Sequence, residues 1–280
     1  MKVAISGASG FIGSHLVQTA LAKGWAVTRI SQELLYSPKD LEIFFNKEQP
    51  DYIWHLASFG NMSHQKDVPM TVFANIIGTF NMLNASKDVN YRAFVNFGSS
   101  SEYGKKFRPM QEEEHILPTS FYGASKAGAT HLAYAFAKHY DKPIFTIRPF
   151  SVYGPGEAAF RFIPTVIRSL KNGTSFVLDE EAYHDWIFIS DFIDGLFLAQ
   201  DKVGTLDSRV INCGTGRQRT NKEIVKMLEK ISGKKALYIP MPNQRPGISE
   251  VWMANTDKLT RLGWYPKVMT EEGLRACYEE

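Results

Sequence analysis

The sequence predicts an α/β protein organised around a doubly wound parallel β-sheet. Two observations support this fold class. Short apolar runs rich in β-branched and aromatic residues alternate with segments of helical periodicity along the first part of the chain. The first of these runs ends in a glycine-rich turn that opens directly into a helix. Strands that alternate with helices of this length pair in parallel, because each helix returns the chain to the same edge of the sheet.

The composition is that of an ordinary globular protein and excludes several classes. Of the 280 residues, 44% are hydrophobic and 22% are charged, which argues against disorder. The net charge of +3 does not indicate a nucleic-acid partner. No apolar run reaches the ~18 residues of a membrane span. Cys213 and Cys277 have neither metal nor disulfide spacing, and the glycine-rich start lacks a signal-peptide cleavage site. We therefore expect a cytoplasmic protein without a metal.

The first strand and its glycine turn form the predicted phosphate site. Lys2–Ser6 is a β-rich run, and the segment after the glycines is typical of a helix that ends at Gly24. Glycines let the backbone approach a pyrophosphate, and the helix N-terminus supplies amide donors. A plain surface turn is the structural alternative, but the place between strand and helix favours a nucleotide. The predicted cofactor contacts here are Gly7, Ser9, Gly10, Phe11, Ile12 and Gly13.

The end of the second predicted strand, over 25–30, bears on the choice of cofactor. Ser31 occupies the position where an acid would bind the ribose 2′-hydroxyl of NAD. Glu33 comes slightly late, and Arg29 is a candidate partner for the 2′-phosphate of NADP only if it does not point away. The sequence therefore leaves NAD and NADP open, and the neutral Ser31 favours NADP mildly.

The following segments continue the alternation. We expect helices over 39–49 and 72–88, and strands over 52–57 and 93–97. Ligands bind beyond the carboxyl ends of parallel strands. The glycine turn, Leu56–Ala57 and Ser99–Ser101 should therefore gather at one edge of the sheet. His55, inside an apolar run, is expected to be a core or cofactor-facing residue rather than a base.

Tyr122 and Lys126 lie one turn apart on a predicted helix that begins near residue 122. An ammonium beside a phenol favours the phenolate, which makes Tyr122 a candidate general acid/base. A hydroxyl from Ser99–Ser101 could hydrogen-bond a substrate oxygen at the same point. An amphipathic helix that happens to carry a Tyr and a Lys is the structural alternative.

Beyond this helix we expect a strand over 143–147 and an ordered Pro/Gly loop over 148–156. The alternation then blurs. Helices are predicted over 162–173, 189–200 and 221–233, with short strands within 176–189. We expect a dinucleotide-binding domain at 1–153 plus about 185–213. A smaller α+β lobe at about 154–184 plus 214–280 would bind the substrate.

Several motifs occur in order along nearly the whole chain. They are GASGFIG at 7–13, HLA at 55–57, NIIGT at 75–79, GSSSEYG at 98–104, YGASK at 122–126, RPFSVYGPG at 148–156, DWIFISDFIDGL at 185–196, NCGTG at 212–216, QRPG at 244–247 and ANTDKLTRLGW at 254–264. With these motifs the chain resembles the extended short-chain dehydrogenase/reductases, in particular their NAD(P)-dependent nucleotide-sugar epimerase/dehydratase group. The resemblance implies a Rossmann-like fold and NAD or NADP as cofactor.

The resemblance also implies a Ser-Tyr-Lys site. Tyr122 would move the proton of a sugar hydroxyl, and Lys126 would lower its pKa and hold the nicotinamide ribose. Ser100 would be the third catalytic residue. Ser99 is the alternative, because this chain has SEYG where many relatives have SEVYG. The remaining implied cofactor contacts are Ser31, Leu56, Ala57, Asn75, Ser99, Tyr122, Lys126, Phe150 and Val152.

The implied substrate contacts are Ser100, Glu102, Ser151, Arg161 and Arg245. Relatives that eliminate water or epimerise can use an acid at Glu102, but a residue that satisfies backbone donors is equally expected there. Arg245 resembles the Arg that grips the substrate diphosphate, with a surface ion pair as the alternative. Ser151 stands where relatives often carry Asn, and His184 where many carry Arg. These departures leave the substrate open.

The expected activity is redox chemistry at C4 of a nucleoside-diphosphate hexose. Epimerisation and reduction of a 4-keto sugar rank close together, ahead of 4,6-dehydration. A non-catalytic redox sensor is the alternative from another class, although such proteins typically lose the Tyr or the Lys. The resemblance implies a homodimer through helices at 122–140 and about 71–87. Leu132, Ala133 and Phe136 could supply its apolar seam or belong to the core.

Overall fold

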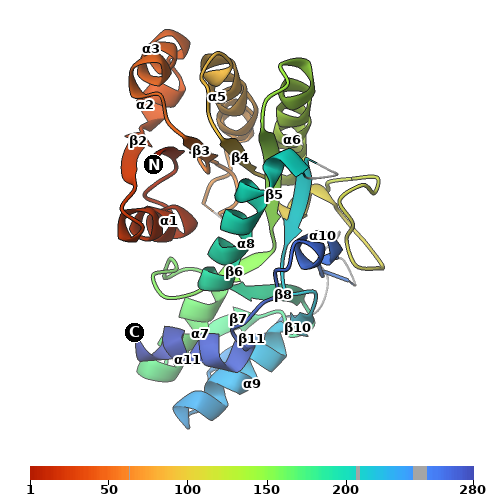
Figure 1. Ribbon diagram of the computed structural model, residues 1–280. Coiled ribbons are helices and arrows are strands. Elements are labelled where there is room, and N and C mark those ends of the chain that lie inside the picture. Colours follow the sequence, from red (N-terminus) through yellow and green to blue (C-terminus); the bar gives the residue numbers. More distant parts are fainter. Residues whose placement is uncertain (63, 206–208, 242–250) are drawn as a thin grey trace. The chain divides into compact units, whose positions relative to one another are not determined.

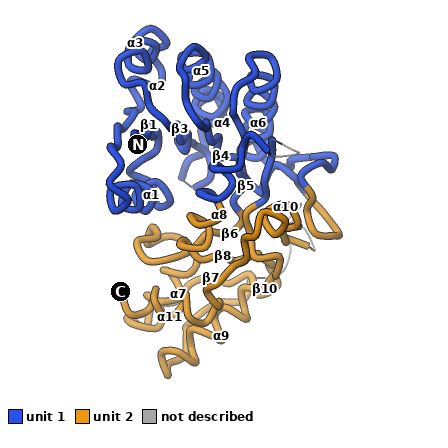
Figure 2. Tube along the Cα trace, in the orientation of Figure 1, with its two compact units in different colours: residues 1–104, 112–149, 196–212 blue, residues 105–111, 150–195, 213–280 orange. Residues whose placement is uncertain are grey.

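The computed structural model describes residues 1–62, 64–205, 209–241 and 251–280, which form two compact units (Figure 1, Figure 2). The first unit contains residues 1–104, 112–149 and 196–212. The second contains residues 105–111, 150–195 and 213–280. The division differs from the predicted domains at 105–111, 150–153 and 185–195, which belong to the second unit. The reason is local pairing: Met110 forms a bridge with Ala254, and β6 (Ser151–Tyr153) forms a parallel ladder with β8 (Tyr183–Phe188).

Among the described residues, the first unit holds a six-stranded sheet with the order β2-β1-β3-β4-β5-β9. The ladders that join β2, β1, β3, β4 and β5 are all parallel. The strands are β1 (Lys2–Ser6), β2 (Ala26–Ile30), β3 (Tyr52–His55), β4 (Ala93–Phe97), β5 (Ile144–Pro149) and β9 (Val210–Cys213). The predicted α/β fold with a parallel sheet is confirmed.

Helices connect these strands, as the periodicity of the sequence predicts. They are α1 (Phe11–Ala22), α2 (Gln32–Leu35), α3 (Pro38–Glu48), α4 (Val68–Val72), α5 (Gly78–Ser86), α6 (Phe121–His139) and α8 (Ile189–Asp201), whose last turns belong to this unit. Short 3-10 turns lie at Ser100–Glu102 (η2) and Val203–Thr205 (η3). The helix predicted over 72–88 begins earlier, at Val68, because Asp67 caps it. A π-helical segment, η1 (Phe73–Ile77), joins α4 to α5.

One face of the sheet is covered by α3, α5 and α6, which lie side by side in Figure 1. Ala4, Ile53 and Phe94 occupy one cross-strand row and form the sheet side of this core. Strands of a parallel sheet that is covered by helices on both faces have continuous apolar sequences. On β3 the neighbouring Trp54 is fully buried and donates to the amide oxygen of Gln200 on α8, at 2.9 Å.

The second unit has two small sheets and a helical layer of its own. β8 pairs with β6 and with β10 (Gln218–Thr220), and β7 (Phe176–Leu178) pairs with β11 (Tyr238–Pro240). The helices are α7 (Phe162–Asn172), α9 (Asn221–Ser232), α10 (Asp257–Arg261) and α11 (Thr270–Glu279), together with the first turns of α8. None of the helices in the described parts of the chain is both long and apolar enough to cross a bilayer.

The buried Asp185 of β8 organises the loops of the second unit. Its carboxylate accepts hydrogen bonds from the backbone N–H groups of Thr215, Gly216 and Ala254, at 2.7–3.0 Å. The Thr215 hydroxyl donates to it as well, at 2.6 Å. A buried carboxylate needs such donors, since an unpaired one costs several kcal/mol, on the order of 3 or more. The sequence motif that contains Asp185 therefore has a structural explanation within this unit.

Candidate active site

The glycine turn between β1 and α1 forms an open backbone cradle. Gly7 has a φ of 71°, and a Cβ there would lie 2.7 Å from the backbone nitrogen of Ala57. A Cβ on Gly13 would clash with the carbonyl oxygen of Gly7. Gly10, the N-cap residue of α1, is exposed and has no side chain that could bond to the N–H groups of the helix. The N–H groups of the first turn are therefore available to an anion, so the residues fit the pyrophosphate of a dinucleotide.

The ends of β1 and β3 are tied together by a buried hydrogen-bonded chain. The hydroxyl of Ser6 lies 2.7 Å from His55 Nδ1 and accepts from the Ala57 N–H at 3.2 Å. On the other side, Nε2 of His55 lies 3.0 Å from the hydroxyl of Thr79. Because Thr79 gives its own proton to the Asn75 carbonyl at 2.7 Å, Nε2 carries the imidazole proton and Nδ1 accepts from Ser6.

His55 is therefore a neutral structural residue. Burial, followed by the charge of Lys126, lowers its pKa to about 3. Its ring has partners on both nitrogens, which agrees with the expected core position and not with a base.

Asn75 connects the π-helical segment η1 to the helix α6. Its amide nitrogen donates to the carbonyl of Phe59 and to the hydroxyl of Ser125, both at 2.8 Å. Its amide oxygen accepts from the Phe59 N–H, also at 2.8 Å. Ser125 in turn donates to the carbonyl of Tyr122, at 2.8 Å. The side chain of Asn75 is thus engaged by the protein, and it holds the loop after β3 against the first turn of α6.

Tyr122 and Lys126 lie at the start of α6, as predicted. Ser120 caps this helix by accepting from the Gly123 N–H at 3.0 Å. Lys126 is only 3% exposed. Burial lowers its pKa to about 8, while the negative charge of Glu102 opposes the shift. The first turn of α6 packs against the turn that follows β4, since a Cβ on Gly123 would clash with the carbonyl oxygen of Ser101.

That turn carries the three candidate serines, and the structure distinguishes them. Ser99 caps η2, since its hydroxyl oxygen accepts from the Ser101 N–H at 3.0 Å. Ser100 is buried, with 5% of its surface exposed. Ser101 lines a cavity of about 510 Å³ together with Tyr122, Gly60 and Gln65. The sequence motif did not reveal this difference, because the three residues are chemically identical.

Glu102 is fully buried beneath the same turn. One carboxylate oxygen accepts from the Ser99 N–H at 2.8 Å, and the other accepts from Nε and NH2 of Arg148, both also at 2.8 Å. The Arg148 guanidinium lies 4.5 Å from the centroid of the Tyr103 ring, whose hydroxyl donates to Asn212 at 2.6 Å. Of the two interpretations of Glu102, these contacts support the structural one. Arg148, which sequence analysis did not single out, is its partner.

The other predicted residues are placed as follows. The Ser31 hydroxyl caps α2 by accepting from the Leu34 N–H at 3.2 Å, and Glu33 is exposed. Phe150, Ser151, Val152 and Arg161 belong to the second unit. Arg245 lies outside the described residues. The hydroxyl of Ser151 lies 3.1 Å from Nδ1 of His184, so the two positions that depart from the relatives are in contact.

Removing the charge of Glu102 should destabilise the protein strongly. The Glu102→Gln variant leaves the buried Arg148 guanidinium without its counter-charge, which typically costs about 3–5 kcal/mol. Urea denaturation measures the loss, and Glu42→Gln on the exposed side of α3 serves as the matched control. Equal stabilities of the two variants would contradict the role assigned to the ion pair.

The Lys126→Met variant should be more stable than the wild type at pH 7. The folded-state pKa of Lys126 lies below its usual value, so burial of the ammonium costs stability below about pH 8. This cost falls as the pH rises from about 8 to 10.5, because the unfolded chain then binds more protons. Met removes this cost of burying the ammonium, so the free energy of unfolding should rise by up to about 3 kcal/mol. Lys138→Met, exposed on the same helix, should change the free energy of unfolding by less than about 0.5 kcal/mol.

A protein-family model and known relatives match most of this chain. The model of the NAD dependent epimerase/dehydratase family matches residues 3–214. A dTDP-glucose 4,6-dehydratase of Haemophilus influenzae is 26% identical, and the alignment covers 98% of this chain and 96% of that protein.

Solved structures share the fold over the full length. The UDP-glucuronic acid 4-epimerase of Bacillus cereus, in complex with UDP-glucuronic acid and NAD, matches with a TM-score of 0.87 and 28% identity, covering 100% of this chain and 98% of that one. The RMD protein of Pseudomonas aeruginosa, complexed with NADPH, has a TM-score of 0.86 at 22% identity, covering 99% and 97%, and shows the fold alone. Solved relatives thus bind NAD or NADPH. The glycine cradle, the Tyr122–Lys126 helix and the match over three quarters of the chain together show that this protein belongs to the NAD dependent epimerase/dehydratase family of the extended short-chain dehydrogenase/reductases.

Proposed function

We propose that this protein is an NAD(P)-dependent oxidoreductase or isomerase that acts at C4 of a nucleoside-diphosphate sugar, as an epimerase or a 4-ketoreductase. The observation that carries the proposal is the buried ammonium of Lys126, one helical turn from Tyr122 on a helix whose first turn packs against the turn after β4. A charged Lys in the interior costs stability, and such a cost is typical of functional sites.

In this proposal each residue has a defined task. The glycine cradle and the N-terminus of α1 hold the pyrophosphate, and Lys126 holds the nicotinamide ribose. Tyr122 takes the proton from the C4 hydroxyl during oxidation and returns a proton to the C4 oxygen during reduction. A hydroxyl of the turn 99–101, assigned to Ser100 from the sequence, donates a hydrogen bond to that oxygen. The bound nicotinamide supplies the chemistry of hydride acceptance and donation.

4,6-Dehydration is the second candidate, favoured by the dTDP-glucose 4,6-dehydratase among the relatives. Elimination of water needs an acid and a base at the neighbouring carbons. The only carboxylate of the turn 99–102 is that of Glu102, and both of its oxygens accept hydrogen bonds within the core. This observation supports the epimerase or ketoreductase.

Mass spectrometry of the purified protein separates the remaining alternatives. Tightly bound NAD that co-purifies supports an epimerase or a dehydratase. Protein that takes up NADPH from solution supports a reductase. The neutral Ser31, whose hydroxyl caps α2, agrees better with NADP than an acid at that position would.

The Tyr122→Phe variant should lose turnover by about 10²–10⁴-fold while it retains cofactor binding, because only the proton-transfer group is removed. Turnover is measured with UDP-, GDP-, dTDP- and CDP-sugars, keto sugars included, and with either nicotinamide. Tyr265→Phe, at an exposed position between α10 and α11, is the matched control. If the wild-type protein converts none of these substrates, the non-catalytic nucleotide-binding alternative replaces the enzyme.

We also propose that the protein forms a homodimer through α6 and the segment from α4 to α5. Large apolar side chains on these helices are exposed by 40–49%, namely Val72, Phe73, Ile77, Phe80 and Tyr134. Ala133, in contrast, is buried in the core, and Leu132 and Phe136 pack against that core. The seam therefore consists mostly of residues that the sequence did not single out.

Phe80→Asp should convert the dimer into a monomer, because a carboxylate in an apolar interface is left without a partner. Light scattering after size-exclusion chromatography measures the mass. Ile43→Asp, at an exposed apolar position of α3, should leave the dimer intact. A wild-type protein that elutes as a monomer at every concentration tested would exclude this interface.

A further inference from the structure

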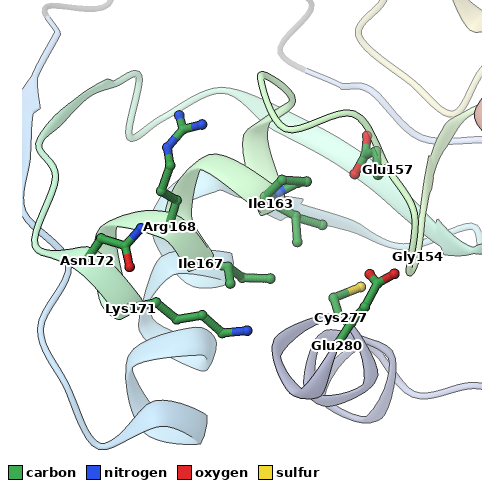
Figure 3. A pocket seen from close by; sticks show the side chains of 10 residues that line it. Gly154, Glu157, Ile163, Ile167, Arg168, Lys171, Asn172, Cys277 and Glu280 are labelled. Atoms are coloured by element: carbon green, nitrogen blue, oxygen red, sulfur yellow. The ribbon is translucent and has the colours of Figure 1, made fainter.

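The second unit contains a cavity of about 260 Å³ that none of the predicted site residues lines. It lies between α7, α11 and the loop after β6 (Figure 3). Its principal side chains are those of Glu157, Ile163, Ile167, Lys171, Cys277 and Glu280. Its volume is several times the ~30 Å³ that one water molecule occupies in the liquid, so the cavity has room for a small organic ligand.

Glu157 gives this cavity its chemical character. Its Oε2 atom is buried and has no hydrogen-bond partner among the described residues. Burial raises the pKa of this carboxyl to about 7, while the positive charge of Arg161 opposes the shift. A buried oxygen without a donor is rare in native proteins, and a bound donor is one of its physical explanations.

A second carboxylate, that of Glu280, points into the same space in Figure 3. It accepts one hydrogen bond from the Gly156 N–H at 2.9 Å. Burial, together with the charges of Glu157 and Glu280, raises the pKa of the intervening Cys277 thiol to about 12. The thiol therefore stays neutral, and the two carboxyls make this end of the cavity negative above about pH 7, where Glu157 is ionised.

The opposite wall is apolar. Ile163 and Ile167 project from α7 into the cavity (Figure 3), and both are at least nine-tenths buried. Arg168 points away from the carboxyls and donates to the carbonyl of Ala159 at 3.2 Å. The Lys171 side chain also lines the cavity and points toward α11 in Figure 3, and its ammonium lies 5.3 Å from the centroid of the Tyr278 ring. The cavity thus combines a negative end with a short hydrocarbon wall.

We propose that this cavity binds a small molecule that carries a primary ammonium group on a short alkyl chain. The ammonium would donate hydrogen bonds to Glu157 Oε2 and to Glu280, and the alkyl chain would pack against Ile163 and Ile167. An ammonium supplies both the missing donor and the counter-charge, whereas a hydroxyl supplies only the donor. This site is independent of the proposed catalytic function.

Calorimetric titration of the full chain with n-butylammonium, 1-butanol and butyrate tests the proposal at pH 8.5. We expect n-butylammonium to bind at least 10-fold more tightly than the alcohol, and butyrate not to bind. Glu157→Gln should reduce the ammonium affinity at least 10-fold, and Glu279→Gln, at an exposed position of α11, should not change it. The wild-type comparison of the three ligands remains decisive even if a variant fails to fold.

The affinity should also depend on pH in a predictable direction. The charged and titratable groups at the cavity are Glu157 and Arg161 in the loop after β6, Arg168 and Lys171 on α7, Cys277 on α11, and Glu280 directly after α11. Because the ammonium requires the ionised carboxylate, affinity should fall about 30-fold from pH 8.5 to 5.5, and Glu157→Gln should abolish this dependence. Equal affinity for butanol and butylammonium, no detectable binding of butylammonium, or unchanged affinity in Glu157→Gln would each overturn the proposal.

Discussion

The buried ammonium of Lys126 is the constraint on which the first unit depends. A positive charge in the interior is unfavourable unless polar groups surround it. Here the burial lowers its pKa, and the nearby Glu102 keeps the shift moderate. The same charge helps to hold His55 neutral at the end of β3. The charge of Lys126 therefore interacts with residues from two segments distant in sequence, His55 at the end of β3 and Glu102 in the turn after β4.

Rigid hydrogen-bonded groups surround this charge. Ser6, His55, Thr79 and Asn75 form a continuous chain from the end of β1 to the π-helical segment, and Asn75 reaches Ser125 on α6. The Glu102–Arg148 ion pair fixes the turn that carries the serines. Such preorganisation matters for proton transfer, since the reacting groups must already be in place when charge develops. A π-helical turn inside a longer helix is a feature often found at functional sites.

In the second unit, two acidic residues differ in their hydrogen-bond partners. Asp185 joins its loops from the interior, and this role needed no ligand to explain it. Glu157 is the opposite case, because its buried oxygen lacks any protein partner in the described residues. Two buried acids in one unit therefore lead to different conclusions. The hydrogen-bond partners, rather than the residue type, separate a structural carboxylate from a candidate binding group.

The sequence by itself determined the parallel α/β fold, the glycine turn between the first strand and the first helix, and the helix with Tyr122 and Lys126, because period, glycine spacing and helical register are local properties. Only the tertiary structure showed that Glu102 is paired with Arg148, that Ser99 to Ser101 differ in environment, and that Ala133 belongs to the core. It also placed 150–153 and 185–195 in the second unit, through the pairing of β6 with β8. Burial and partner choice depend on contacts between distant segments, and a single sequence does not record those contacts.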